Sequence, residues 1–206
     1  MEKIVTIATL KDGAIHGVAF VDYPNGSYFH GQYNNNIREG VGVYKKKNGN
    51  YYIGLWKNGT RHGQGLIMND KNQIVAAGIF ANGKLVTPQH EAYLSDKSNK
   101  ACKGNCYDGF GAYTHDNGDK YWGFFKNGKR SFVGIYTWKN GSSYRGGYTE
   151  DGIRNGFGIY TYQDDSLYRG IFVNDAIDGL GLMRYIKSGN VRWGVFDPKG
   201  RKVRDY

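Results

Sequence analysis

The stretch Tyr52-Ile-Gly-Leu-Trp-Lys-Asn-Gly-Thr-Arg-His-Gly-Gln-Gly65 contains the pattern that decides the fold. An aromatic-x-Gly-x-aromatic segment, Tyr52 to Trp56, is followed by Asn58-Gly59 and then by a Gly-x-Gly pair. Aromatic residues favour strands, and Asn-Gly tolerates the positive φ angles that tight β-turns require. The stretch therefore predicts a β-hairpin.

The same pattern recurs along the chain, which indicates a repeat architecture. Its central glycines are Gly31, Gly54, Gly78, Gly123, Gly146, Gly170 and Gly194. Successive centres are 23 or 24 residues apart, except for one step of 45 that equals two steps with a copy missing. The 32 glycines accompany 18 tyrosines, 10 phenylalanines and 4 tryptophans, and this aromatic content argues against disorder.

Two segments, Tyr52 to Gly65 and Tyr121 to Arg130, resemble MORN repeats, and the pattern covers about residues 13–86 and 101–197. The resemblance implies an all-β fold, an elongated single-sheet solenoid of consecutive antiparallel hairpins. It also implies a protein that binds other proteins, or in some members membranes, without catalysing a reaction.

Residues 84–100 interrupt the repeats with polar sequence. Because the interrupted step is close to two repeat lengths, we expect an inserted loop within one domain spanning residues 1–206. The alternative is a linker between two separate repeat blocks.

Cys102 and Cys106 follow this interruption. Two reduced thiols in a turn, a disulfide, and half of a metal site are the three alternatives. A structural zinc needs about four ligands and only His90 and His115 are near in sequence, so we expect no metal.

Alternation along the strands sorts the side chains into two faces. The first face carries the aromatic residues expected to contact a partner, unless they stack on one another as a core: Tyr33, Tyr44, Tyr52, Trp56, Tyr121, Phe125, Tyr144, Tyr148, Tyr160 and Tyr168. The second face is apolar and is a candidate second interface through Ile53, Leu55, Trp122, Phe124, Phe157 and Trp193. Strands that are apolar on both faces are normally buried on both. We therefore expect the second face to be covered by a second copy in a homodimer, by another chain, or by the curl of the sheet.

The sequence gives no catalytic signature. It lacks a His-Glu-x-x-His metal pair and a Gly-x-Ser-x-Gly elbow, and its Gly-x-Gly pairs lie in expected strands where they cannot cradle a phosphate at a helix start. We therefore expect a non-enzymatic scaffold without a cofactor, which binds a peptide or helix of a protein partner along the repeat sheet.

The net charge of +10 is consistent with an anionic partner. The alternative function is binding of anionic membrane lipid headgroups through the basic tail from Lys199 to Arg204. Nucleic acid ranks third, because no basic-aromatic motif of a known binding module is present. The start of the chain is a poor signal peptide and no apolar run approaches the roughly 18 residues of a membrane helix. We expect a cytoplasmic location, with peripheral membrane association in the lipid-binding alternative.

Overall fold

The computed structural model describes residues 5–96 and 101–204, which form two antiparallel β-sheets and one short helix. The N-terminal sheet contains, among these residues, β1 (Val5–Lys11), β2 (Ala14–Asp22), β3 (Tyr28–Asn34), β4 (Ile37–Lys45), β5 (Tyr51–Lys57), β6 (Thr60–Met68), β7 (Ile74–Ala81) and β8 (Lys84–Pro88).

The C-terminal sheet contains, within the same described ranges, β9 (Cys102–Gly104), β10 (Gly109–Thr114), β11 (Lys120–Lys126), β12 (Lys129–Thr137), β13 (Ser143–Tyr148), β14 (Arg154–Thr161), β15 (Leu167–Val173), β16 (Ala176–Arg184), β17 (Val191–Phe196) and β18 (Lys202–Arg204). In both sheets every strand pairs with its neighbours in sequence, so each sheet is a row of consecutive hairpins, as the repeats predict.

The strand register aligns the glycines of successive strands. Gly54 faces Gly42 on one side and Gly65 on the other, and the hairpin turn after β5 has Asn58 at φ 50° and Gly59 at φ 75°. These are the positive angles that the Asn-Gly pair predicted. The paired glycines leave a strip of bare backbone on which aromatic rings lie.

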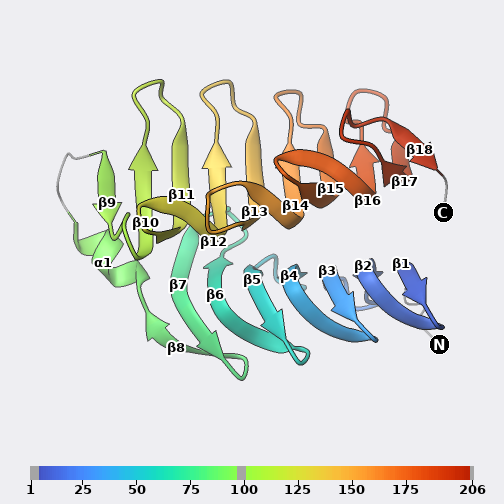
Figure 1. Ribbon diagram of the computed structural model, residues 1–206, viewed down its shortest axis with the longest axis horizontal. Coiled ribbons are helices and arrows are strands. Elements are labelled where there is room, and N and C mark those ends of the chain that lie inside the picture. Colours follow the sequence, from blue (N-terminus) through green and yellow to red (C-terminus); the bar gives the residue numbers. More distant parts are fainter. Residues whose placement is uncertain (1–4, 97–100, 205–206) are drawn as a thin grey trace.

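The two sheets pack face to face (Figure 1). Buried side chains from both sheets form the inner core: Val18, Phe20, Val41, Val43, Ile53, Leu66, Met68, Ala77, Phe110, Phe124, Val133, Ile135, Phe157 and Leu180. The expectation of a single-sheet solenoid is therefore wrong. The apolar second face of each repeat block is covered by the second face of the other block, which answers the question of what buries it.

The connection between the blocks reverses the direction of the repeat array. Within the inserted loop expected for residues 84–100, it contains β8 and the helix α1 (His90–Ser95), and residues 97–100 lie outside the described part. α1 lies at one end of the molecule, and β1 and β18 lie at the other (Figure 1). The helix packs on the inner core through Tyr93, whose ring centroid lies 5.9 Å from that of Phe110.

Candidate functional site

The outward face of each sheet carries its own aromatic cluster. In the C-terminal sheet the Tyr121 ring packs edge-to-face against Phe125 and Tyr148, with centroid separations of 5.1 and 5.5 Å. The Tyr121 hydroxyl donates a hydrogen bond of 2.9 Å to the carbonyl of Phe124. Burial raises the pKa of the Tyr121 phenol well above its ordinary value, so this hydroxyl stays protonated and serves as a structural donor.

Most of the aromatic residues expected to contact a partner lie within these clusters. Tyr44 and Tyr160 are half-buried, and the remaining members are buried: Tyr33, Tyr52, Trp56, Tyr121, Phe125, Tyr144, Tyr148 and Tyr168. The buried rings form the packed clusters of the outward faces.

The residues expected at a second interface lie on the inner faces. Ile53, Phe124 and Phe157 are buried in the inner core, whereas Leu55 and Trp122 are partly buried. Trp193 on β17 retains 37% exposure. The inner face of each sheet is therefore largely buried by the other sheet of the same chain.

A continuous row of rings crosses the outward face of the C-terminal sheet at the ends of its strands. We call this row, made of Tyr113, His115, Tyr136, Trp138, Tyr160 and Tyr162, the aromatic ladder. Adjacent centroids are 4.9, 5.7, 4.7, 5.2 and 4.7 Å apart in that order. Apart from Tyr136, which is buried, these rings are partly exposed.

Of the six ladder residues, only Tyr160 was among the predicted contact residues. Three of the five that were missed do not lie in a strand. His115, Trp138 and Tyr162 each open the turn that follows the second strand of a repeat, β10, β12 and β14 respectively. The Trp138 amide, for example, donates to the Ser142 carbonyl at 2.9 Å across its turn. Their signal was an aromatic ring at one fixed repeat position, three residues before Gly118, Gly141 and Asp165.

Arginines lie over the outward rings in several repeats. The guanidinium carbon of Arg154 is 5.7 Å from the Trp138 ring centroid and 6.0 Å from that of Tyr160, within the range of cation–π attraction. Arg38, Arg61 and Arg130 lie over rings of other repeats. Positive charge thus accompanies the aromatic surface in both sheets.

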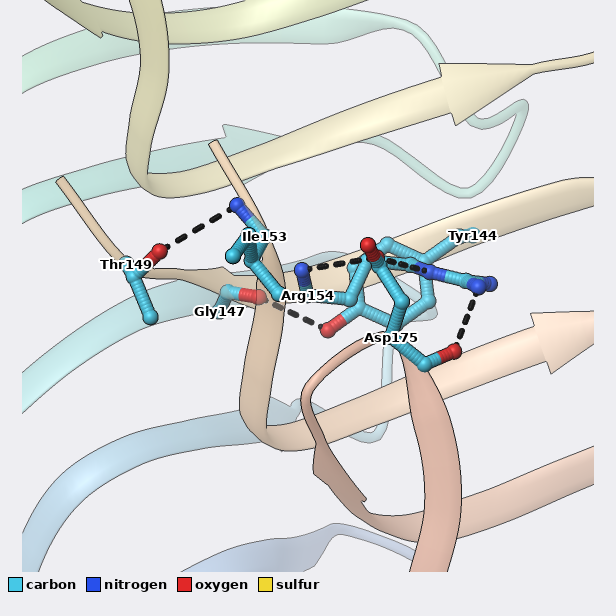
Figure 2. A network of polar contacts seen from close by, with 6 residues as sticks. All are labelled: Tyr144, Gly147, Thr149, Ile153, Arg154 and Asp175. Carbon is cyan, nitrogen blue, oxygen red and sulfur yellow. Dashed lines mark hydrogen bonds and ion pairs between the residues drawn. The ribbon is translucent and has the colours of Figure 1, made fainter. Parts of the chain in front are cut away.

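Asp175 fixes the position of Arg154 (Figure 2). Its carboxylate accepts hydrogen bonds of 2.9 Å from both the backbone amide and Nε of Arg154. Burial opposes ionisation of Asp175, but these hydrogen bonds and the nearby guanidinium outweigh it and hold the pKa of the carboxyl below its usual value. A cavity of about 290 Å³ opens beside this pair, between Arg154, Tyr162, Pro198 and Lys199.

Cys102 and Cys106 are joined by a disulfide in the structure. Cys106 packs against the outward aromatic cluster of the C-terminal sheet. Within residues 5–96 and 101–204, no three His, Cys, Asp or Glu side chains gather where they could hold a metal ion.

A polar group lies between the sheets around His30. The His30 Nε2 atom is 3.0 Å from the Asp22 carboxylate, the Tyr28 ring stacks on the imidazole at 4.2 Å, and Arg169 of the opposite sheet approaches Nδ1 at 3.5 Å. Burial, assisted by the Arg169 charge and opposed by Asp22, lowers the pKa of His30 from 6.5 to about 4. His30 is therefore neutral in the folded protein near neutral pH.

We expect the free energy of unfolding to decrease as the pH falls from 6.5, the ordinary pKa of His30, to about 4, its pKa in the folded protein. Below about pH 6.5 the unfolded chain binds a proton at His30 that the folded chain rejects, so about 3 kcal/mol is lost by the time pH 4 is reached. Urea denaturation across this range should show the decline, and His30→Gln should flatten it. An equally steep decline in the variant would assign the effect to other groups.

Comparison with known proteins identifies similarity along much of the chain. The family model of the MORN repeat matches residues 29–51, 52–67, 121–143, 144–166 and 168–190, which together exceed half of the sequence. A search of curated proteins finds no match.

Among solved structures, the chain is similar to the SAS-4 (dCPAP) TCP domain of Drosophila melanogaster, solved in complex with a proline-rich motif of Ana2 (dSTIL). The identity is 12% and the TM-score 0.26, over 96% of this chain and 80% of that chain. No functional conclusion follows from a likeness at this TM-score. Finally, no helix in the described part of the chain is long and apolar enough to cross a membrane.

Proposed function

Since the chain belongs to the MORN-repeat family, we propose that it is a non-enzymatic scaffold that binds an extended peptide of a partner protein along the aromatic ladder. The observation that carries this proposal is the unbroken row of rings from Tyr113 to Tyr162, which spans successive hairpins. Tyrosine and tryptophan provide large contact area at low entropic cost, which is why they are enriched in binding surfaces.

The spacing of the hairpins favours an extended peptide over a helix. Neighbouring strands are about 4.8 Å apart, so the ladder repeats about every 9.6 Å. A polyproline II segment repeats about every 9.3 Å, with three residues of about 3.1 Å each. Two turns of an α-helix span about 10.8 Å, so a helix loses register by more than about 1 Å at each hairpin. A peptide with an apolar or proline side chain at every third residue fits the ladder best.

Alanine substitution of Trp138 should weaken binding of such a peptide by about 30-fold, because truncating a central aromatic in an interface removes about 2 kcal/mol. The peptide is first selected from an array of proline-rich sequences and its affinity is then measured by fluorescence polarisation. The matched control is Trp193→Ala on β17, which removes an exposed tryptophan outside the ladder and should leave the affinity unchanged.

The same assay with anionic lipid vesicles tests the alternative function. A peptide that stacks on the aromatic ladder should tolerate moderate salt, whereas binding of the basic tail to vesicles should weaken steeply with salt. Equal affinities of wild type and Trp138→Ala, or no peptide selected at all, would contradict the ladder proposal. Salt-sensitive vesicle binding would then support the lipid alternative.

A further inference from the structure

A second cavity, of about 440 Å³, lies between the two sheets beside α1. The apolar part of its lining includes Met68 and Ile74 from the N-terminal sheet, Trp122 and Ile135 from the C-terminal sheet, and Tyr93 from α1. Its volume is at the lower end of the range of about 300 to 1,000 Å³ that is typical of small-molecule sites. The cavity opens on the inner side of the C-terminal sheet and the aromatic ladder lies on the outer side, so the two sites are distinct.

Among the described residues, one cation lines this cavity, the guanidinium of Arg145 on β13. Nη1 of Arg145 donates to the Tyr51 hydroxyl at 3.1 Å and to Oδ1 of Asn72 at 3.2 Å. These two neutral groups hold the guanidinium in place, and no residue within 5–96 and 101–204 forms an ion pair with it.

Arg145 has no carboxylate partner among the described residues, and its Nε is enclosed without an acceptor there. A charge held at an apolar interface is costly unless an opposite charge accompanies it. Arg154, by comparison, has Asp175 as its fixed partner on the outward face. Arg145 is partly buried, so its guanidinium offers a positive charge to a ligand that enters the cavity.

The remaining polar groups of the lining are uncharged or weakly basic. Asn72, Gln73 and Thr137 offer hydrogen bonds at the rim, and burial lowers the pKa of His90, which keeps its imidazole neutral near neutral pH. A single guanidinium balances one negative charge. A phosphate or nucleotide, with two or more charges, would lack further cations among the described residues that line the cavity.

We propose that this cavity binds a small organic acid with one carboxylate and an apolar body. The carboxylate pairs with Arg145, whose planar guanidinium suits that geometry, and the apolar body lies against Trp122 and Tyr93. The proposal does not depend on peptide binding at the ladder.

Octanoate and its uncharged counterpart octanol are the probes that test this site, by isothermal titration calorimetry on the full chain. Octanoate should bind, and octanol should bind at least tenfold more weakly. Arg145→Gln should weaken octanoate binding tenfold or more without affecting octanol. Arg192→Gln, which removes an arginine that lies over the Tyr185 ring outside the cavity, should leave both affinities unchanged.

A second variant keeps the test decisive if Arg145→Gln fails to fold. Asn72→Asp places a carboxylate beside the guanidinium on a turn residue with φ 61°, a conformation that aspartate tolerates, so it supplies the missing charge internally. This variant should also lose octanoate binding tenfold or more. Equal binding of octanoate and octanol, or octanoate binding that survives both substitutions, would overturn the proposal.

Discussion

Replacing Phe157 with alanine should lower the free energy of unfolding by about 3 to 5 kcal/mol and destabilise both sheets together. The Phe157 side chain is fully buried between the sheets. Its ring packs edge-to-face on Phe20 of the opposite sheet, with centroids 6.2 Å apart. Alanine would leave a void that neither sheet can close alone, because the strands on each side are held by their own hydrogen-bond ladders.

Urea denaturation gives the change in stability, and amide hydrogen exchange reports on each sheet separately. The matched control is Val173→Ala on the neighbouring strand β15, where the side chain is 40% exposed and the change should stay within about 0.5 kcal/mol. If the N-terminal sheet kept its protection while the C-terminal sheet lost its own, the two blocks would be independent units. The expectation of a single domain over residues 1–206 would then be wrong.

The hairpins could be predicted from the sequence because their causes are local. Tyr52, Gly54 and Trp56 define a strand face, and Asn58-Gly59 defines the turn, so strand pairing and glycine register follow from one repeat. The packing of the two sheets could not be predicted in this way. An apolar face such as that of Ile53 and Leu55 requires a cover, but a second copy, another chain and the same chain all satisfy that requirement. The connection that decides among them lies in a segment without a repeat.

The candidate functional sites, like the fold, could be predicted only in part from the sequence. Alternation within strands identified the buried rings, but it does not apply to Trp138 and Tyr162, because these residues open turns. Both residues nevertheless occupy a fixed position in the repeat. Arg145 carried a clearer signal. It occupies the position between the aromatic residue and the central glycine, where other repeats have Ile53 or Trp122. The next repeat has Arg169 at the same position, so these two repeats bring a positive charge to the inner face.

The aligned glycines predict the second large effect on stability. A Cβ atom on Gly134 would lie 2.3 Å from the Tyr121 hydroxyl oxygen and 2.5 Å from Cζ of the same ring. That ring is fully buried and its hydroxyl is hydrogen-bonded, so it cannot move aside without disrupting the outward cluster. Gly134→Ala should therefore cost about 3 kcal/mol, the upper end of the usual range for overpacking.

The control for this substitution is Gly59→Asn in the turn after β5. Gly59 has φ 75°, and no heavy atom lies within 4 Å of the position that a Cβ atom would occupy, so asparagine should cost no more than about 1 kcal/mol there. Combining Gly134→Ala with Tyr121→Leu should recover part of the loss relative to the sum of the two single changes, because the smaller side chain relieves the clash. Strict additivity in urea denaturation, or a Gly134→Ala loss no larger than that of Gly59→Asn, would show that the ring does not require the glycine. The presence of glycine at these paired positions would then need an explanation other than the packing of aromatic rings against the backbone.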